Sequence, residues 1–364
     1  MKKLIEIDKN MLSPFGIDAE DVKYFDVNEA PIDLYGVKYD NDSKKFVRMP
    51  TKIAKQVSEN VEALNFHTSG GRLRFVTDSP FITLTANLPQ IEEGTNMPLT
   101  GKCGFDVYVK RNGKYQMEWI FYPNSSSQNL LSSMRYFPED EGVEKDILIN
   151  LPLYTSVKDI QIGIKKECFL KKAPKYKTES RVVFYGSSIT QGGCVNHPGN
   201  AYPAILSRKY DFDFLNLGFS GSALAEDIMI DYIKNLDMSI FVLDYDHNAP
   251  DEQHLKNTHL KFYKSVRQAN PDLPIVIVTS PFGIYDLDGR RKARKQVIID
   301  TYNYAVANGD KNVFLIDEEN YADDYGYDYA LSDMVHPNDL GHFLIAKSMF
   351  KTFENIENKK QMLK

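Results

Sequence analysis

The sequence predicts two domains, an N-terminal antiparallel β-sandwich and a C-terminal three-layer α/β domain with a parallel sheet. Two observations carry this prediction. In the first half of the chain apolar residues alternate with polar ones, as in strands with one buried and one solvated face. In the second half short, nearly continuous apolar runs alternate with helical segments, which is typical of a parallel sheet covered on both faces.

The N-terminal half contains three clear period-two segments. Their apolar positions are Ile82, Leu84, Ala86 and Leu88, then Phe105, Val107 and Val109, then Ile160, Ile162 and Ile164. Turn-forming residues separate such segments at Ser69-Gly70-Gly71, Asn112-Gly113 and Pro123-Asn124. Residues 1–168 are therefore expected to form a jelly-roll-like antiparallel sandwich.

The C-terminal half begins after a lysine-rich stretch, residues 169–180, which is the predicted linker. The predicted strands that follow are 181–185, 212–217, 240–243, 275–279 and 313–316. The predicted helices are 202–210, 223–236, 252–268, 291–307 and 339–353. Residues 181–364 are therefore expected to form the α/β domain.

The composition excludes several classes of protein. A chain of 364 residues is longer than one hydrophobic core usually supports, which favours two domains. Its 42% hydrophobic and 26% charged residues are typical of a globular protein. The net charge of −6 argues against general nucleic-acid binding. No apolar run approaches the roughly 20 residues of a membrane-spanning helix, so neither nucleic acid nor membrane is an expected partner.

The cysteines and the first residues bear on the cellular compartment. Cys103, Cys168 and Cys194 are too few and too irregular for a disulfide framework or a Cys-x-x-Cys zinc site. Residues 1–15 lack the apolar core of a signal peptide because acidic residues interrupt it. The expectation is a cytoplasmic location, unless a signal peptide was removed ahead of residue 1.

Polar residues follow the predicted strands where ligands bind in open α/β sheets. The runs after the first, second, third and fifth strands are Gly186–Thr190, Gly218–Gly221, Asp244–Asn248 and Ser332–Pro337. One edge of the sheet is therefore expected to gather Ser188, Gly221, Asn248, Asp333 and His336.

This set predicts nucleophilic catalysis by a serine. A serine hydroxyl needs an adjacent base, which His336 can supply. Asp333, three residues earlier, can orient the imidazole and stabilise its charged form. Attack on an ester carbonyl creates an oxyanion, and the available donors are the backbone N–H groups of Ser188 and Gly221 and the side-chain amide of Asn248.

Together and in this chain order, these residues resemble the four motif blocks of the SGNH (GDSL-type) hydrolases, a family of serine esterases on a flavodoxin-like sheet. The blocks are Gly186-Ser187-Ser188-Ile189-Thr190, Gly221, Asn248 and Asp333-x-x-His336-Pro337. The resemblance covers residues 180–350. It implies Ser188 as nucleophile, Gly221 and Asn248 as oxyanion donors, and Asp333 with His336 as the acid–base pair.

Two departures from the common motif resemble one branch of this family. Ser187 stands where the motif usually has Asp, and Asp246-His247-Asn248-Ala249 replaces Gly-x-Asn-Asp. Both variants look like the branch that carries an N-terminal β-sandwich and removes acyl groups from carbohydrates. Pro31-Ile32-Asp33-Leu34-Tyr35 also resembles a Gly-x-Asp-Leu-Tyr motif of such N-terminal domains, with Pro31 replacing the glycine.

Each site residue also has a plainer interpretation. Ser188 is compatible with an ordinary turn, and Asn248 with a loop residue that bonds the backbone. Asp333 is compatible with the N-cap of the last helix. Gly218 competes with Gly221 for the oxyanion role, but Gly221 matches the spacing of the family block.

Other histidines offer weaker alternatives. His197, in the loop after the nucleophile, is a rival base, but no carboxylate lies near it in the sequence to orient it. His247 is expected either to line the pocket or to make a structural hydrogen bond. A metal site is not predicted, because His254 and His259 do not share a helix face. The candidate ligands considered are Asp244, Asp246, His247, His254 and His259.

Two surface features remain. A basic cluster is typical of a solvated face, although its place after the fourth strand would allow contact with an anionic substrate. Its members are Arg290, Arg291, Lys292, Arg294 and Lys295. Three tyrosines before Asp333 can stack on sugar rings or pack over the loop, and they are Tyr325, Tyr327 and Tyr329.

The sequence therefore predicts a serine esterase that forms an acyl-Ser188 intermediate and uses neither cofactor nor metal. The family resemblance implies removal of short acyl groups, O-acetyl first, from a carbohydrate. The expected partner is an acylated small molecule or oligosaccharide. The alternatives are a lipid esterase or thioesterase of the same family, and a non-catalytic carbohydrate-binding protein. Substrate-binding residues are not assigned, and the oligomeric state is left open, with a homodimer as one option.

Overall fold

The computed structural model describes residues 19–29, 31–89, 91, 96–137, 140, 142–280, 290–317, 321, 324 and 326–362. The chain divides into two compact units. Described residues of Met1–Arg48, Phe66–Lys175 and Asn196–Gly199 belong to the first unit. The second unit contains the described residues of Met49–Asn65, Tyr176–Val195 and Asn200–Lys364.

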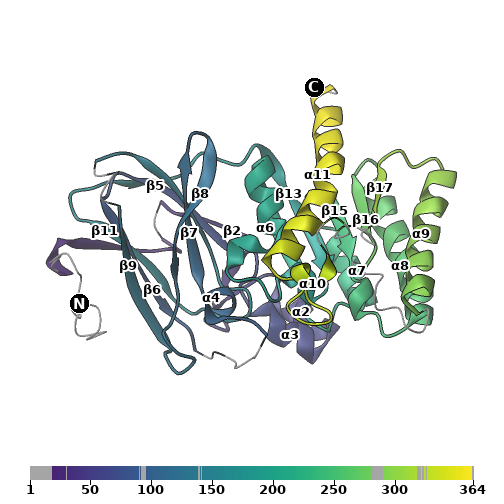
Figure 1. Ribbon diagram of the computed structural model, residues 1–364, viewed down its shortest axis with the longest axis horizontal. Coiled ribbons are helices and arrows are strands. Elements are labelled where there is room, and N and C mark those ends of the chain that lie inside the picture. Colours follow the sequence, from purple (N-terminus) through teal and green to yellow (C-terminus); the bar gives the residue numbers. More distant parts are fainter. Residues whose placement is uncertain are drawn as a thin grey trace. The chain divides into compact units, whose positions relative to one another are not determined.

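The first unit contains two antiparallel sheets (Figure 1). One has the order β1-β11-β6-β9, with bounds Val22–Asp26, Ile160–Lys165, Phe81–Asn87 and Leu130–Tyr136. The other has the order β12-β5-β10-β7-β8, with bounds Leu170–Lys171, Arg72–Thr77, Lys145–Asn150, Phe105–Arg111 and Lys114–Phe121. Strand β2 (Asp33–Tyr35) also pairs with β5. Smaller elements are η1 (Ala19–Asp21), β3 (Lys38–Asp40), β4 (Lys45–Val47) and α4 (Leu99–Lys102).

The alternation seen in the sequence builds the core of this unit. The alternate apolar residues of β6, β7 and β11 are all buried in one cluster, and they are Ile82, Leu84, Ala86, Phe105, Val107, Val109, Ile160, Ile162 and Ile164. In a strand every second side chain lies on the same face. Because residues from both sheets share this cluster, the two sheets pack face to face, and the predicted antiparallel sandwich is confirmed.

The second unit is built on a parallel five-stranded sheet in the order β14-β13-β15-β16-β17. The bounds, in that order, are Phe212–Gly218, Thr178–Gly186, Met238–Asp244, Ile275–Val278 and Val313–Ile316. Numbered along the chain this is the order 2-1-3-4-5, which is that of flavodoxin-like folds. Ligands bind in such folds at the carboxyl ends of the strands around the first one, here β13. The predicted parallel sheet is confirmed.

Helices cover both faces of this sheet. Their bounds are Tyr202–Tyr210 (α6), Asp227–Lys234 (α7), Glu252–Ala269 (α8), Arg290–Ala307 (α9) and Asp339–Met362 (α11). Helices α7, α8 and α9 pack on the face that contains Val183 and Leu243, with α8 and α9 side by side in Figure 1. Helices α6 and α11 pack on the face that contains Phe184 and Val242. Both faces of each strand are buried, which explains the continuous apolar runs.

Two predicted helices differ from the observed ones by more than one residue at an end. Helix α7 begins at Asp227 rather than at 223, because Ala225 has a left-handed φ of +56° and Glu226 is extended. Helix α11 continues to Met362 rather than ending at 353. No helix in the described part of the chain is long and apolar enough to cross a membrane.

The sequence analysis did not predict helices α2 (Thr51–Val57) and α3 (Glu59–Asn65). Although they lie between strands of the first unit in the sequence, they belong to the second unit, where Ala54 and Val61 join the core under α7 and α8. Each has only seven residues, too few for a clear helical period.

The expected domain boundaries, 1–168 and 181–364 with a linker at 169–180, stay a prediction. The structure gives parts of the linker secondary structure. Leu170–Lys171 pairs with β5 of the first unit, and Thr178 already pairs with Phe212 of the second. Phe169 and residues 172–177 are the parts of the predicted linker that lie in no strand.

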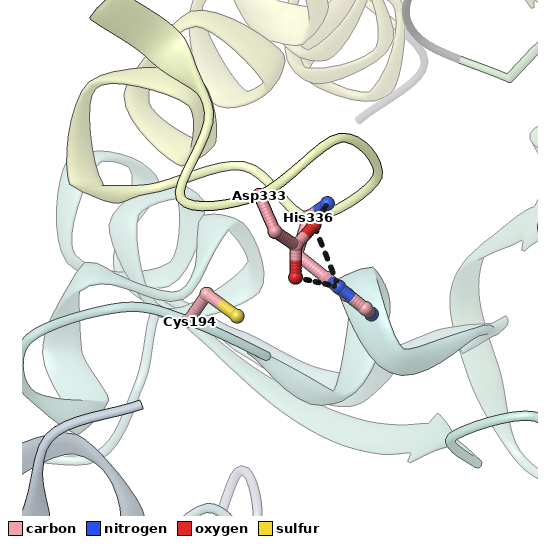
Figure 2. Close-up of side chains that lie close together, drawn as sticks. All are labelled: Cys194, Asp333 and His336. Atoms are coloured by element: carbon pink, nitrogen blue, oxygen red, sulfur yellow. Dashed lines mark hydrogen bonds and ion pairs between the residues drawn. The ribbon is translucent and has the colours of Figure 1, made fainter. Parts of the chain in front are cut away.

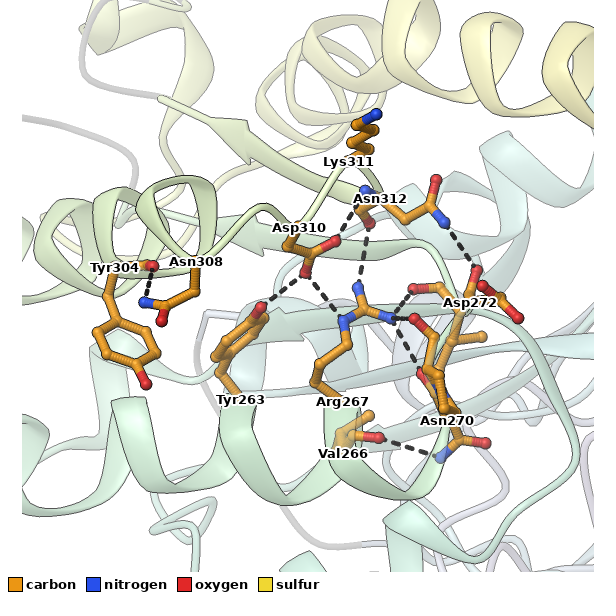
Figure 3. A network of polar contacts seen from close by, with 12 residues as sticks. Tyr263, Val266, Arg267, Asn270, Asp272, Tyr304, Asn308, Asp310, Lys311 and Asn312 are labelled. Carbon is orange, nitrogen blue, oxygen red and sulfur yellow. Dashed lines mark hydrogen bonds and ion pairs between the residues drawn. The ribbon is translucent and has the colours of Figure 1, made fainter.

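A polar network closes the amino-terminal ends of β16 and β17 (Figure 3). Arg267 Nε donates to the carboxylate of Asp310 at 2.8 Å, and Tyr263 OH donates to the same oxygen at 2.6 Å. The Arg267 guanidinium also donates to the carbonyl oxygens of Asn270 and Leu273. These bonds join the last turns of α8 to the segments that lead into β16 and β17, at the end of the strands opposite the one that carries the candidate site.

Candidate active site

The carboxyl end of β13 leads into a short helix that begins at Ser188. This helix, α5, spans Ser188–Gln191, and its N-cap is Ser187, whose Oγ accepts a hydrogen bond from the N–H of Ile189 at 3.1 Å. Ser187 therefore supplies a capping oxygen at the position where the family motif usually has an aspartate. A four-residue helix has no recognisable period, so no sequence pattern predicts it. Ser188 is 8% exposed.

Ser188, His336 and Asp333 form a continuous line of contacts. Ser188 Oγ lies 3.0 Å from Nε2 of His336, and Nδ1 of His336 lies 2.9 Å from Oδ2 of Asp333 (Figure 2 shows the second contact). A carboxylate only accepts hydrogen bonds, so Nδ1 carries the proton and Nε2 is the acceptor for the serine hydroxyl. This is the arrangement in which an imidazole can remove the proton of a serine.

A tight turn holds Asp333 and His336 together. Asp333 Oδ1 accepts hydrogen bonds from the N–H groups of Val335 at 2.8 Å and His336 at 2.7 Å. The N–H of Ser332 donates to the carbonyl oxygen of His336 at 2.9 Å. Helix α11 is capped by Asn338, whose side-chain oxygen accepts from its first turn. The alternative reading of Asp333 as the cap of the last helix is therefore wrong.

A chain of hydrogen bonds joins the ends of β13, β14 and β15. The N–H of Phe219 donates to the carbonyl oxygen of Gly186 at 2.9 Å. The side-chain Nδ2 of Asn248 donates to the carbonyl oxygen of Phe219 at 2.7 Å, from the 3-10 turn η4 (Asp246–Asn248). A primary amide has two N–H groups, so this bond fixes Asn248 and leaves it a second donor.

The two glycines after β14 differ in what requires them. Gly221 has a φ of +65°, and a Cβ at this position would have no atom within 4 Å, so the backbone conformation alone favours glycine. A Cβ at Gly218 would lie 2.3 Å from the backbone N of Gln191 in α5. Gly218 is therefore needed for close packing of α5 on β14, whereas Gly221 presents its backbone to open space.

A buried carboxylate supports α5 from the end of β15. Asp244 is 5% exposed, and its Oδ2 accepts hydrogen bonds from the hydroxyls of Tyr202 at 2.9 Å and Thr190 at 3.0 Å. Burial raises the pKa of Asp244 to about 7, and the two hydroxyls oppose that shift. Asp244, considered from the sequence only as a metal-ligand candidate, thus has a supporting role that the sequence did not predict.

Two members of the basic cluster on α9 are engaged in ion pairs. Arg294 Nε donates to the buried carboxylate of Asp246 at 2.9 Å. Lys295 Nζ lies 2.8 Å from a carboxylate oxygen of Asp317. Two of the five basic side chains in the cluster therefore have acidic partners within the protein, so no bound anion is needed to explain them. The side chain of Arg290 lies outside the described residues.

His247, beside Asn248, makes a structural hydrogen bond. Its Nε2 lies 2.7 Å from Oγ of Ser280. Burial, together with the positive charges of Arg291 and Arg294, lowers the pKa of His247 to about 3. The ring is therefore neutral at ordinary pH.

The rival base, His197, has a partner that the sequence did not reveal. Its Nδ1 lies 2.6 Å from Oδ2 of Asp106, and both residues belong to the first unit. His197 therefore has an orienting carboxylate, contrary to the expectation, because Asp106 lies 91 positions earlier in the chain. The imidazole that contacts Ser188 Oγ is nevertheless that of His336.

The remaining candidates have structural contacts. His254 Nε2 lies 2.8 Å from the carbonyl oxygen of Leu224, and His259 Nδ1 lies 2.8 Å from Thr301 Oγ1. The ring of Tyr327 packs against another tyrosine, and Tyr329 is 69% exposed. Tyr325 lies outside the described residues.

Among the described residues, one group of three side chains has metal-ligating atoms close together. Its members are Cys194, Asp333 and His336, with ligand atoms within 4.8 Å of one another (Figure 2). The five candidate ligands considered from the sequence form no such group within the same part of the chain.

Comparisons with known proteins match both halves of the chain. Residues 179–354 match the GDSL-like lipase/acylhydrolase family. Residues 22–170 match the GxDLY family, the N-terminus of SGNH-hydrolase-type esterases. No curated protein matches the chain.

Several solved structures align with most of the chain. A candidate GDSL-like lipase from Bacteroides ovatus is 26% identical, with a TM-score of 0.81. The salicylyl-acyltransferase SsfX3 of a tetracycline biosynthetic pathway is 17% identical, with a TM-score of 0.74. A family two carbohydrate esterase from Cellvibrio japonicus is 15% identical, with a TM-score of 0.59. Each alignment covers 93% of this chain and 98% of the other.

The second and third of these likenesses show the fold alone, whereas the two family matches cover residues 22–170 and 179–354 of the sequence itself. The resemblance read from the sequence is confirmed. The chain belongs to the GDSL-like lipase/acylhydrolase (SGNH) family of carboxylic ester hydrolases and carries the N-terminal domain of SGNH-type esterases.

Proposed function

We propose that this chain is a serine esterase that removes short acyl groups, O-acetyl groups first among them, from a carbohydrate. The observation that carries the proposal is the line of contacts from Ser188 Oγ to His336 Nε2, 3.0 Å, and from His336 Nδ1 to Asp333 Oδ2, 2.9 Å. A hydroxyl, an imidazole and a carboxylate in this order are the parts that acyl transfer through serine requires.

The geometry supports a two-step reaction. His336 Nε2 takes the proton of Ser188 as Oγ attacks the ester carbonyl, and Asp333 stabilises the imidazolium that forms. The N–H of Gly221 and the second N–H of the Asn248 amide are the proposed donors to the oxyanion, together with the N–H of Ser188. The imidazolium returns its proton to the leaving alcohol, and water then attacks the acyl-Ser188 ester.

The carbohydrate part of the proposal is supported by related proteins. The Cellvibrio japonicus protein is a family two carbohydrate esterase, and another family two carbohydrate esterase, from Clostridium thermocellum, was solved with cellohexaose. Both align over about nine-tenths of this chain, which includes the N-terminal sandwich. At 15% identity they support the choice of substrate class to test first.

The first experiment is hydrolysis of p-nitrophenyl acetate, butyrate and octanoate by the wild type, Ser188→Ala and Ser187→Ala. Loss of a triad member should lower kcat by several orders of magnitude, whereas Ser187 is the matched control because its Oγ is engaged in the cap of α5. Acetate should be the preferred acyl group. Octanoate turned over as fast as acetate would favour the lipid esterase or thioesterase alternative.

The substrate is then tested with acetylated xylan and acetylated cello-oligosaccharides, by measuring released acetate. The proposal expects a higher kcat/KM on an acetylated oligosaccharide than on p-nitrophenyl acetate. Binding of the glycan without release of acetate by the wild type would overturn the esterase proposal and favour the non-catalytic carbohydrate-binding protein.

A second candidate function is acyl transfer to an alcohol instead of water. The likeness to the salicylyl-acyltransferase, with a TM-score of 0.74 over 93% of this chain, is the observation that favours it. Both reactions share the acyl-Ser188 step and differ only in what attacks it. Adding cellobiose to the p-nitrophenyl acetate assay separates them, because a transferase forms acetyl-cellobiose faster than acetate.

A further inference from the structure

A cysteine that the proposed reaction does not use lies beside the catalytic pair. Cys194 follows α5 and is 6% exposed. Its carbonyl oxygen accepts a hydrogen bond of 3.4 Å from Ser332 Oγ, in the turn that carries Asp333 and His336. Its φ of +69° is in the left-handed region. Figure 2 shows its sulfur pointing toward the Asp333 carboxylate, which in this view lies between the sulfur and the His336 ring.

The spacing of these three side chains fits the ligand set of a borderline-soft divalent cation. The sulfur of Cys194, a carboxylate oxygen of Asp333 and a ring nitrogen of His336 all lie within 4.8 Å of one another. In a tetrahedral zinc site, with bonds of about 2.3 Å to sulfur and 2.1 Å to oxygen or nitrogen, such ligand atoms are about 3.6 Å apart. Cys194 is buried, so small rotations of the half-exposed Asp333 and His336 side chains would have to cover the difference.

The chemistry of the donors favours zinc over magnesium or calcium. A thiolate, an imidazole and a carboxylate are ligands of Zn²⁺ and of the chemically similar Cd²⁺, whereas the hard cations prefer oxygen alone. Three protein ligands leave a fourth position for water.

We propose that Cys194, Asp333 and His336 form an inhibitory site for Zn²⁺, and the inhibition part of this inference rests on the proposed esterase function. A metal ion bound by the carboxylate of Asp333 and the imidazole of His336 makes both groups unavailable for catalysis. Cys194 is the residue that turns an ordinary acid–base pair into a three-ligand site.

The proton balance explains why the metal-bound state is inactive. The Cys194 thiol releases its proton to solvent when its sulfur binds the ion. Coordination through Nδ1 of His336 requires that nitrogen to be unprotonated, so the ring proton moves to Nε2. A protonated Nε2 donates to Ser188 Oγ and cannot accept its proton, so the serine is not activated.

The activity test titrates ZnCl₂ into the EDTA-treated, reduced enzyme during hydrolysis of p-nitrophenyl acetate. The wild type should be inhibited, and Cys194→Ala should keep its activity but need at least about tenfold more Zn²⁺ for half-inhibition, since loss of even an outer-shell partner costs that much affinity. Cys168→Ala is the matched control and should behave like the wild type. Equal inhibition of the wild type and Cys194→Ala would overturn the proposal, and so would an uninhibited wild type.

A second variant guards against misfolding at this position. Cys194→Gly removes the thiol and suits the positive φ, so it should fold and resist Zn²⁺ like Cys194→Ala. If both variants fold and both remain as sensitive as the wild type, the thiol is not a ligand.

A direct binding measurement separates this inference from the proposed function. Cd²⁺ added to the metal-free protein should produce the ultraviolet charge-transfer absorption of a Cd–thiolate bond. The signal should be the same in the wild type and in Ser188→Ala, which needs no activity, and should be absent in Cys194→Ala. An inactive wild type that still shows the signal would overturn the esterase proposal only. An active wild type without it would overturn the metal site only.

Discussion

Replacing Asp333 by asparagine tests the catalytic geometry more sharply than removing the side chain. In the structure Asp333 Oδ1 accepts from the N–H groups of Val335 and His336, so the asparagine oxygen is expected to keep that place. The amide nitrogen then occupies the position of Oδ2, 2.9 Å from Nδ1 of His336. Because an amide N–H₂ only donates, Nδ1 must become the acceptor and the ring proton must move to Nε2. The turn survives, but His336 cannot accept the serine proton.

The size of the effect follows from the charge that Asp333 supplies. A carboxylate and an imidazolium with charge centres about 4 Å apart attract each other by about 4 kcal/mol at an effective dielectric constant of 20. Each 1.36 kcal/mol is a factor of ten in rate, so this attraction corresponds to about 10³ in kcat. The side chains of His336 and Asp333 are 26% and 34% exposed, so solvent screens part of it. The lost charge alone therefore corresponds to a loss of about 10² to 10³, and the wrong tautomer of His336 adds to it, so we expect a loss of at least about 10².

The assay is kcat for p-nitrophenyl acetate at neutral pH, with thermal unfolding measured on the same samples. Asp328→Asn is the matched control, since Asp328 is exposed at the start of α10 (Tyr327–Ala330). It should leave kcat unchanged. An Asp333→Asn enzyme that unfolds at the wild-type temperature and keeps more than a tenth of the wild-type kcat would refute the reasoning, because His336 would then need no carboxylate to orient it.

Three further substitutions test the surroundings of the nucleophile. Asn248→Ala should lower kcat by about 10²–10³ with little change in KM, as loss of one oxyanion donor does, and steady-state kinetics checks this. Gly221→Ala should cost about 1–2 kcal/mol in urea unfolding because of its φ of +65°, without a steric clash. The pKa of Asp244 is about 7 when folded and 3.8 for an ordinary Asp, so the folded state binds more protons between these values. The free energy of unfolding of the wild type should therefore decrease as pH rises from about 4 to about 7. Asp244→Asn has no titrating group at this position, so its Tm should fall less steeply over the same pH range.

The sequence was sufficient to predict the sheet and the order of the site residues along it. Alternation in Ile160, Ile162 and Ile164 places one face of β11 in the core, and the continuous run in β16 reflects burial on both faces. Each of these signals is local, because the period of burial is set by the strand itself. Ser188 and His336 could be brought together from the sequence because both follow strands of one parallel sheet, whose carboxyl ends share an edge.

The features that the sequence did not predict depend on contacts between distant segments or on very short elements. Helix α5 has four residues, too few for a period, and is recognisable only from the cap bond of Ser187. The bonds from Thr190 and Tyr202 to Asp244 join three segments of the chain, so no local pattern contains them. The left-handed φ of Cys194, at a residue that is not glycine, has no sequence signal at all.

The comparison of His336 with His197 indicates which property favours His336 as the proposed base. Nearness of a carboxylate in the sequence favoured His336, but in the structure both imidazoles have one at their Nδ1, from Asp333 and Asp106 respectively. A carboxylate partner therefore orients a ring without making it catalytic. The distinguishing property is the atom that the other ring nitrogen contacts. For His336 that nitrogen is Nε2, and it lies 3.0 Å from Ser188 Oγ. His197→Gln should accordingly keep the acyl-transfer step, with the same acyl-chain preference on p-nitrophenyl esters, whereas His336→Gln should lose turnover on all of them.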